Sequence, residues 1–488
     1  MRAKTKFAGI WRCLLTVACT GVLLWFGTGL QPWWPLLWFA PLPVLLYAMR
    51  SSWRGTAVVA ILSWAAGGMN LWWVFVHELE LPVFVAASVV LIPAVVFALC
   101  VLLFRALVVR EAYWWALVSF PAAWVSAEYL NNRTSVHGTF GNLAYSQLEC
   151  LPLLQVASVT GPWGISFFLL LFSSTLAMGV YLWRTEPKLA VHVVFGGLGA
   201  VALALILGGV RLAVPEHGPM VKVGLIASDA PGNRNIADAG ADTERLFREY
   251  AAAADKAVGQ GARALVIPEK VGVVVDPETR TTDAFFSALA EKTRAVIVVG
   301  MVRATAERGA QGRELYNEAR VYAPGRAPLS YDKQHMLPPF ESQLKPGTAL
   351  TTMEETSGKW GVEICKDMDF TPLSREYGVL GTGLLLVPAW DFGVDRTLHG
   401  HMALMRGVES GFSMARAAKL GFLTVSDNRG RVLAESRSDA GGRFTTLVAN
   451  VPVDHVQTLY LRFGDWFAWV TMAVLAGCLG RLSLTRAA

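Results

Sequence analysis

Long uncharged stretches dominate the first 213 residues and constrain the fold more than any other feature. Seven apolar runs occur there, at roughly 9–28, 33–49, 56–76, 82–104, 112–130, 162–183 and 190–210. An eighth run occupies about 466–482. One helix that crosses a bilayer needs about 20 apolar residues. Soluble folds do not stack seven such runs in succession, so the sequence predicts eight membrane-spanning helices.

The charged residues are distributed very unevenly. Residues 1–213 contain 12 Lys/Arg and 6 Glu, whereas residues 214–455 contain 28 Lys/Arg and 30 Asp/Glu. Residues 456–488 hold three Arg and one Asp. We therefore predict a membrane domain with seven helices at 1–213 and a soluble domain of ordinary composition at 214–455. The remainder, 456–488, is predicted to contain the eighth helix and a short cytoplasmic tail.

The basic residues between the apolar runs predict the orientation of the chain. Arg50 and Arg54 follow the second run, Arg105 and Arg110 follow the fourth, and Arg184 follows the sixth. If every run spans, these residues fall on one side, and basic loops lie in the cytoplasm. The seventh run then delivers residues 214–455 to the opposite side. The net charge of +6 thus reflects membrane topology, and we expect no nucleic-acid partner.

The soluble region shows short β-rich runs between amphipathic helical stretches, which is typical of an α/β layered fold. Strands are predicted at 221–227, 263–269, 295–302, 318–322, 328–331, 359–367, 381–390 and 421–427. Helices are predicted at 243–260, 283–294, 371–377 and 399–418. The chain as a whole is predicted to be a multi-pass α-helical membrane domain joined to an α/β domain.

Cysteine usage narrows the chemistry. Five of the six cysteines lie in or beside the apolar runs, and Cys365 is the one cysteine of the soluble region. An intradomain disulfide is thereby excluded, and no C-x-x-C metal pattern occurs. The histidines are scattered without ligand spacing, so neither a metal nor another cofactor is expected. Cys365 is either a buried structural residue or a nucleophile.

Two charged residues occupy positions similar to that of Cys365, at the ends of predicted strands. Glu269 ends ALVIPE, and Lys333 follows the strand LSY. Strand ends of one sheet can converge at one edge. A carboxylate can then take the thiol proton, and a fixed cation can stabilise an oxyanion. Each charge taken alone is equally compatible with a solvated loop residue.

These stretches resemble the nitrilase, or carbon–nitrogen hydrolase, superfamily, whose catalytic residues are Glu, Lys and Cys in this chain order. The resemblance is carried by IPE ending at Glu269, YDKQHMLPPFE containing Lys333, and EIC ending at Cys365. It extends through VPAWDFG, HMALMRGVESGF and MARAAKLG at 387–421. The resemblance implies an α-β-β-α sandwich for this nitrilase-like domain.

Such a domain between a seventh and an eighth membrane helix is similar to the apolipoprotein N-acyltransferase family, as is the segment GNLAYSQ at 141–147. The resemblance implies acyl transfer from a phospholipid, through a thioester on Cys365, to the α-amine of a diacylglyceryl lipoprotein. Glu269 would be the general base, Lys333 would stabilise the oxyanion, and Glu341 would support Lys333. It also implies a multi-pass protein of the bacterial inner membrane with a periplasmic catalytic domain.

Further residues near these motifs are candidates for the cleft lining, namely Trp390, Asp391 and His335. Some positions depart from the family pattern: Lys366 and Asp367 follow the cysteine in place of an aromatic residue and Glu, and Lys270 follows Glu269 in place of a small residue. Because these departures leave the substrate open, a membrane-anchored amidase or hydrolase and a related acyltransferase with another acceptor stay as alternatives. The third alternative is a catalytically dead scaffold or lipid-binding protein, which the intact Cys365, Glu269 and Lys333 disfavour.

Overall fold

The computed structural model describes residues 2–215, 218–309 and 312–484. The chain divides into two compact units. The helical unit comprises Met1–Thr134, Gly141–Ala213 and Phe463–Ala488, and the sheet unit comprises Ser135–Phe140 and Val214–Arg462. The six residues 135–140 therefore fold with the sheet unit although both of their neighbouring segments are helical.

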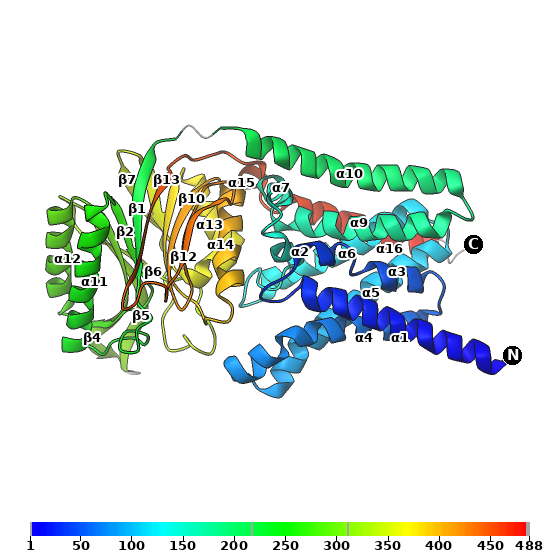
Figure 1. Cartoon of the computed structure of the whole chain (residues 1–488), viewed down its shortest axis with the longest axis horizontal. Helices are drawn as coiled ribbons and strands as arrows, with labels where there is room; N and C mark the ends of the chain where they lie inside the picture. Colours follow the sequence, from blue (N-terminus) through cyan, green and yellow to red (C-terminus); the bar gives the residue numbers. More distant parts are fainter. Residues whose placement is uncertain (1, 216–217, 310–311, 485–488) are drawn as a thin grey trace. The chain divides into compact units, whose positions relative to one another are not determined.

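The helical unit consists of long apolar helices joined by short turns (Figure 1). Its elements are α1 (Arg2–Gly27), α2 (Trp34–Leu37), α3 (Leu42–Ala48), α4 (Trp53–Gly68), the 3-10 helix η1 (Met69–Leu71), the π-helix η2 (Val74–Glu78), α5 (Val83–Val109), α6 (Tyr113–Thr134), η3 (Leu143–Gln147), α7 (Leu151–Leu154), α8 (Ala157–Thr160), α9 (Pro162–Leu182), α10 (Pro187–Ala213) and α16 (Trp466–Leu484).

Large apolar side chains remain exposed on these helices, as expected where the solvent is lipid. Phe84 of α5 and Phe195 of α10 are each 76% exposed. Among the described residues, five helices are long and apolar enough to cross a membrane: α1 from Gly9, α5, α9, α10 and α16. The run at 33–49 is divided into α2 and α3, and α4 has only 16 residues. A total of eight spans stays a prediction.

Buried polar contacts fix the GNLAYSQ segment within the helical unit. Glu128 of α6 accepts hydrogen bonds from Trp124 Nε1 at 2.9 Å and from the Leu143 amide at 2.8 Å. Asn142 caps η3 by accepting from the Ala144 amide at 2.8 Å. A half-buried carboxylate in an apolar helix needs such partners, so Glu128 holds the start of this segment in place.

The sheet unit contains strands and helices in alternation, with the helix α15 at its C-terminal end. Its elements are β1 (Met220–Ala227), α11 (Ala241–Gly259), β2 (Ala264–Ile267), β3 (Val273–Val275), α12 (Thr279–Thr293), β4 (Val296–Gly309), β5 (Gly312–Tyr322), β6 (Leu329–Asp332), β7 (Thr351–Glu355), β8 (Gly358–Val362), the 3-10 helix η4 (Cys365–Asp369), α13 (Thr371–Val379), β9 (Leu384–Trp390), α14 (Arg396–Ser410), β10 (Ser413–Lys419), β11 (Phe422–Ser426), β12 (Val432–Arg437), β13 (Thr445–Pro452) and α15 (Leu459–Phe463).

The described strands form two sheets. The first has the order β13-β1-β2-β4-β5-β6, with β3 beside β4, and the second has the order β12-β11-β10-β9-β8-β7. Apolar side chains from both sheets form one core cluster between them, which includes Val223 of β1 and Leu386 of β9. The inner strands β2 and β9 are continuous apolar runs because both of their faces are buried.

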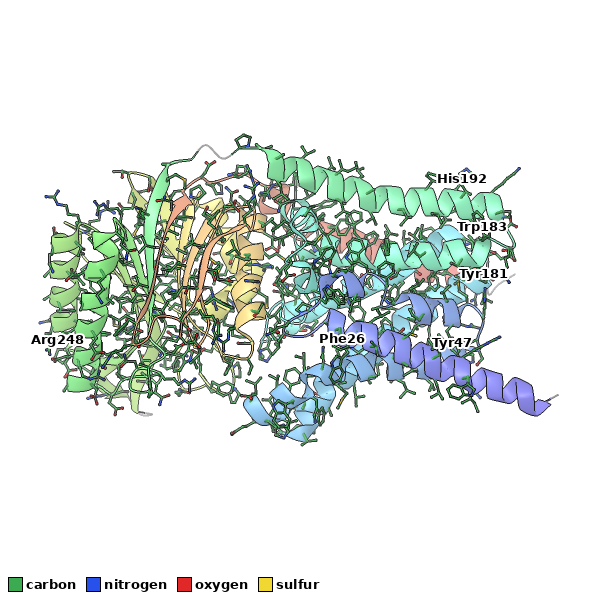
Figure 2. The ribbon with its side chains drawn as sticks, in the orientation of Figure 1. Phe26, Tyr47, Tyr181, Trp183, His192 and Arg248 are labelled. Carbon is green, nitrogen blue, oxygen red and sulfur yellow. The ribbon has the colours of Figure 1, made fainter. Side chains whose placement is uncertain are left out.

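Helices cover the outer face of each sheet (Figure 1). Residues of α11 and α12 pack on the first sheet, and residues of α13 and α14 pack on the second. The predicted α-β-β-α sandwich is thereby confirmed. Helix α11 shows the pattern expected of an outer layer: Leu246 and Tyr250 face the sheet, whereas Arg248 points outward with 68% of its side chain exposed and pairs with Glu244 (Figure 2).

Two predicted elements extend too far along the chain. The strand predicted over 359–367 ends at Val362, and Cys365–Asp369 form the 3-10 helix η4. The sequence predicts a helix over 399–418, but α14 ends at Ser410 and β10 begins at Ser413. Gly411 ends the helix in the left-handed conformation with φ +76°. The following residues, SMARAAK, have the composition of a helix, yet they form a central strand because β9 and β11 pair with them on either side. Tertiary pairing overrides local propensity here.

Candidate active site

Cys365 occupies a tight turn after β8. The strand ends at Val362, and Cys365 begins η4 with φ +45°, a conformation that residues other than glycine seldom adopt. Its thiol is buried, at 6% exposure, and donates to the Trp390 carbonyl oxygen at 3.5 Å. Unusual backbone conformations of this kind cluster at functional sites. The turn thus fixes the direction of one reactive side chain.

Glu269 and Lys333 meet in the interior of the sheet unit. Glu269 follows β2 and Lys333 follows β6, and the distance from Lys333 Nζ to Glu269 Oε1 is 2.9 Å. Both side chains are at most 2% exposed. Asn317 of β5 donates its side-chain amide to the same Oε1 at 2.5 Å. The carboxylate is therefore held in one rotamer by two donors.

Glu341 completes this cluster on the other side of Lys333. Lys333 Nζ donates to Glu341 Oε2 at 2.8 Å, and the Leu337 amide donates to the same oxygen at 2.9 Å. Lys270 pairs with Glu341 Oε1 and lies 3.4 Å from Glu269 Oε1. The structure thus brings together two carboxylates and two ammonium groups. Their charges balance, as burial of charged groups requires.

The charges of this cluster control its protonation. Burial acts to raise the pKa of Glu269, but the ammonium groups of Lys270 and Lys333 hold it well below its usual value. Burial acts to lower the pKa of Lys333, but Glu269 and Glu341 raise it well above its usual value. At neutral pH Glu269 is a carboxylate and Lys333 is an ammonium ion.

The thiol of Cys365 is neutral in the resting site. Burial, together with the charge of Glu269, raises its pKa to about 11, and the cations Lys333, His399 and Arg416 act in the opposite direction. A thiol in such a site is a poor nucleophile by itself. Attack must therefore be coupled to removal of the thiol proton.

Two polar groups of the cluster remain available for interaction with a substrate. In the described part of the chain, Glu269 Oε2 is buried without a hydrogen-bond partner. Lys333 uses two of its three ammonium donors in the bonds to Glu269 and Glu341. One acceptor and one donor thus remain available on the two side chains that the sequence predicts as base and oxyanion partner.

The three residues that the sequence places near the cleft differ in their surroundings. His335 stacks on Phe370, with 3.6 Å between ring centroids, and its Nδ1 lies 3.0 Å from Asp367 Oδ1. The Lys419 side-chain nitrogen lies over the Trp390 ring, 3.6 Å from the ring centroid. Asp391 is buried, and both of its oxygens accept from the guanidinium of Arg416, at 2.6 and 3.0 Å.

Asp367 ties the Lys333 segment to the Cys365 turn. It accepts from the Tyr331 hydroxyl at 2.7 Å and from the His335 amide at 2.8 Å. The Gln334 amide donates to it as well, at 3.2 Å. A single buried carboxylate in η4 thereby fixes the chain on both sides of Lys333. No sequence motif predicts this role for Asp367, which stands out in the sequence only as a departure from the family pattern.

His399 of α14 is a further residue of the site that the sequence did not single out. Its ring nitrogens lie 3.5 Å from oxygens of Asp369, Asp391 and Asp395. The possible ligand atoms of Cys365, Asp391 and His399 all lie within 4.8 Å of one another, which is a donor set suited to zinc. Arg416 already engages both oxygens of Asp391, so this group is better described as an ion-pair network.

The 135–140 strap, defined as Ser135–Phe140, binds the far end of the Cys365 turn. Thr139 donates both its amide, at 2.9 Å, and its hydroxyl, at 2.7 Å, to the Asp369 carbonyl oxygen. His137 Nδ1 lies 3.2 Å from Lys366 Nζ. Gly138 has φ +54°, and a Cβ atom there would lie 2.5 Å from the Asp369 oxygen. A strap this close requires glycine at 138.

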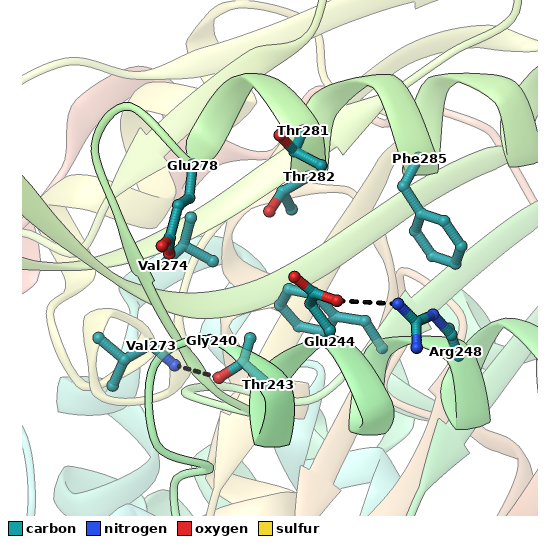
Figure 3. A pocket seen from close by; sticks show the side chains of 11 residues that line it. Gly240, Thr243, Glu244, Arg248, Val273, Val274, Glu278, Thr281, Thr282 and Phe285 are labelled. Atoms are coloured by element: carbon teal, nitrogen blue, oxygen red, sulfur yellow. Dashed lines mark hydrogen bonds and ion pairs between the residues drawn. The ribbon is translucent and has the colours of Figure 1, made fainter.

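A cavity of about 150 Å³ lies on the outer layer of the sheet unit, between α11 and α12 (Figure 3). Its lining includes the ion pair between Glu244 and Arg248 and the hydrogen bond from the Val273 amide to Thr243 Oγ1 (Figure 3). None of the residues around Cys365 that are described above lines it. The cavity is therefore distinct from the candidate active site around Cys365.

Comparison with protein-family models gives two matches along the chain. Residues 20–175 match the apolipoprotein N-acyltransferase N-terminal domain, and residues 234–460 match the carbon–nitrogen hydrolase domain. The chain is similar to the apolipoprotein N-acyltransferase family along both of its units. Its helical and sheet units thus carry the two domains that the family combines, and the resemblance inferred from the sequence is confirmed.

Curated relatives agree with this assignment. The apolipoprotein N-acyltransferase of Geobacter metallireducens is 28% identical over 386 residues, which cover 73% of this chain and 72% of that protein. The enzyme of the same name from Nitrosomonas europaea is 27% identical over 405 residues and covers 76% of each chain. The comparisons support a multi-pass membrane acyltransferase for lipoprotein N-acylation, and not the hydrolase alternative.

Among solved structures, a nitrilase-superfamily protein from Saccharomyces cerevisiae is similar to the sheet unit. It is 22% identical with a TM-score of 0.40, and the match covers 48% of this chain and 90% of that protein.

Proposed function

We propose that this chain transfers a fatty acyl group from a phospholipid to the α-amine of the diacylglyceryl cysteine at the N-terminus of lipoproteins. The observation that carries the proposal is that Cys365, on its strained turn, lies where it feels the charge of the Glu269 carboxylate, whose second oxygen is unbound in the described structure. Lys333, fixed between two carboxylates, supplies the cation. Similarity to the family supports the lipoprotein acceptor.

In the first half-reaction, Glu269 takes the Cys365 proton while the sulfur attacks the ester carbonyl of the phospholipid. This coupling is needed because the thiol is protonated at rest. The tetrahedral intermediate carries its negative charge on the former carbonyl oxygen, and the remaining N–H of Lys333 can donate to it. Collapse breaks the C–O bond. Glu269 returns the proton to the leaving oxygen, which yields a lysophospholipid and acyl-Cys365.

In the second half-reaction, the lipoprotein amine attacks the thioester carbonyl. Glu269 accepts a proton from the attacking nitrogen, and Lys333 again stabilises the oxyanion. Collapse breaks the C–S bond, the proton returns to sulfur, and the product is an amide. Only acyl and proton transfers occur, so the reaction as proposed needs no cofactor. It predicts ping-pong kinetics.

Glu341 and Asn317 act as positioning residues in this scheme. Glu341 holds the Lys333 ammonium together with Glu269, and Asn317 donates to both carboxylates, at 2.5 and 3.0 Å. Neither supplies a proton to the substrate. Their contribution is a fixed geometry, which is what electrostatic stabilisation of an oxyanion requires.

The membrane setting follows from the nature of the substrates. Both the donor and the acceptor carry acyl chains in a bilayer, so a tethered site raises their effective concentration. The basic loops after the second, fourth and sixth apolar runs orient the sheet unit to the periplasmic side of the bacterial inner membrane. Trp390 and His335 are proposed to lie at the cleft, with Asp391 buried beneath them.

Incubation of the purified protein with acyl-labelled phospholipid tests the first step. A labelled thioester on Cys365 is expected in the wild type and is absent in Cys365→Ser, whereas Cys150→Ser, the same change at another buried thiol, retains the label. Failure of the wild type to form any thioester would refute the proposal.

Addition of a diacylglyceryl lipopeptide tests the second step. Discharge of the label into a triacylated peptide is expected, and discharge only to free fatty acid would indicate a hydrolase. Growth of a bacterium depleted of its own N-acyltransferase, restored by the wild type and not by Cys365→Ser, tests the same function in the cell.

A further inference from the structure

A single imidazole is surrounded by three carboxylates next to the Cys365 turn. His399 Nε2 lies 3.5 Å from Asp369, and its Nδ1 lies 3.5 Å from both Asp391 and Asp395. The His399 side chain is 11% exposed, and those of Asp369 and Asp391 are at most 4% exposed. The three carboxylates come from three different elements: η4, the end of β9 and the start of α14. This convergence is a product of the tertiary fold.

The carboxylates keep this ring protonated. Burial acts to lower the pKa of His399, but the negative charge of Asp369, 3.5 Å from the ring, and the nearby Asp395 raise it well above its usual value. A neutral imidazole has only one N–H donor and would point a lone pair at a carboxylate from its other nitrogen. The imidazolium has two donors and avoids that repulsion.

The cation lies beside the nucleophilic sulfur. The nearest polar atoms of Cys365, Asp391 and His399 are all within 4.8 Å of one another. Four charged groups act on the thiol: Glu269 from β2, Lys333 from β6, Arg416 from β10 and His399 from α14. Lys333 is paired with two carboxylates, and Arg416 is held by both oxygens of Asp391.

Charge balance explains what His399 contributes. The carboxylates of Asp369, Asp391 and Asp395 are offset by Arg416, by Lys366 at 3.8 Å from Asp369, and by His399. Without the imidazolium, the carboxylates next to the sulfur would lose one compensating cation and would oppose thiolate formation more strongly.

We propose that His399 is a positioning residue whose imidazolium, held by three aspartates, stabilises the Cys365 thiolate when Glu269 removes its proton. This inference rests on the proposed role of Cys365 as the nucleophile. It does not depend on which lipid or acceptor the enzyme uses, because it concerns only the ionisation of the thiol.

The test measures thiolate formation directly. The purified full-length protein is alkylated with iodoacetamide from pH 6 to 10, and modification of the Cys365 peptide is followed by mass spectrometry. The alkylation rate follows the thiolate fraction, and loss of a nearby opposite charge shifts a pKa by about one unit or more. His399→Gln should therefore alkylate about tenfold more slowly at pH 8 than the wild type.

His401→Gln is the matched control, because it makes the same change two residues along α14 at a histidine paired with Glu435 at 3.0 Å. Its profile should equal that of the wild type. Asp395→Asn removes one carboxylate but retains an oxygen for the Phe392 amide, which donates to Asp395 at 3.0 Å. It should alkylate at least as fast as the wild type, because the imidazolium keeps two carboxylates and the thiolate loses a repulsive neighbour.

Slower alkylation of His399→Gln separates electrostatics from damage to the fold, since local unfolding would expose the buried Cys365 thiol and accelerate its alkylation in either variant. A wild-type profile in folded His399→Gln, or slower alkylation of Asp395→Asn, would overturn the inference. If His399→Gln fails to fold, the Asp395→Asn result decides alone. Alkylation does not require acyl transfer, so failure of the proposed function would appear separately, as a missing thioester with an intact alkylation profile.

Discussion

Replacement of Lys333 by methionine separates its structural role from its proposed catalytic role. Lys333 Nζ lies 2.9 Å from Glu269 and 2.8 Å from Glu341, and all three side chains are at most 2% exposed. At an effective dielectric constant of about 20, each contact is worth about 6 kcal/mol of gross attraction, most of which offsets the cost of burying the charges. Removing the cation leaves Lys270 as the one ammonium group within 4 Å of either carboxylate among the described residues.

The expected loss of stability is about 3–5 kcal/mol, the usual cost of leaving a buried charge unpaired. For a unit of this size, the loss corresponds to a decrease of roughly 10 °C in the unfolding temperature. Adding Glu341→Gln to Lys333→Met restores the balance between Glu269 and Lys270, so the double variant should recover several degrees. Neither variant should form a thioester on Cys365, because the oxyanion donor is absent from both.

Thermal unfolding in detergent and mass spectrometry of the Cys365 peptide measure the two effects independently. An unfolding temperature for Lys333→Met equal to that of the wild type would refute the account of the buried ion pair. Thioester formation at a normal rate in the double variant would refute the oxyanion role. Glu341→Gln alone serves as the control, because it retains the lysine and one of its carboxylate partners.

Three other predictions concern the surroundings of the site. Gly138→Ala should lower the unfolding temperature and slow thioester formation, because the added methyl group collides with the Asp369 carbonyl oxygen. If the variant and the wild type have the same unfolding temperature and the same rate, the 135–140 strap does not hold the Cys365 turn in place. Burial lowers the pKa of Lys419 to about 7, so between about pH 7 and 10.5 the unfolded chain binds one more proton than the folded chain, and the free energy of unfolding rises with pH. Lys419→Met should lose this rise when unfolding is measured across that pH range, and an unchanged slope would exclude Lys419 as its cause. Asp367→Asn should decrease the rate of thioester formation by tenfold or more, since it weakens three hydrogen bonds that hold the chain around Lys333. A rate equal to that of the wild type would show that these hydrogen bonds are dispensable for the reaction.

Much of the fold could be predicted from the sequence because the signals are local. The uncharged runs before Ala213 and the alternation of strands and helices after it each reflect burial of one side-chain pattern. The predicted helix over 399–418 failed for a related reason. The SMARAAK segment has little intrinsic preference for a strand, and only its neighbours β9 and β11 decide its conformation.

The candidate site was predicted only in part. Motifs in a recognisable order along the chain predict four of its residues, namely Glu269, Lys333, Glu341 and Cys365. Asn317 lies in the middle of a strand between charged and apolar residues, where an isolated asparagine gives no signal of burial. Its polarity within a strand that pairs on both sides is the one hint that the sequence offers.

The sequence alone is enough to divide the chain into an apolar and a charged region, to indicate the family to which it is similar, and to predict the residues that we propose carry out acyl transfer. Only the fold brings the charged side chains around Cys365 together in the interior of the sheet unit. Lys270, Asp367 and His399 resemble ordinary surface residues in the linear chain, and each becomes part of the site through partners 32 to 71 residues away or on another element. The physical reason is that motifs are local in sequence, whereas charge compensation is local in space.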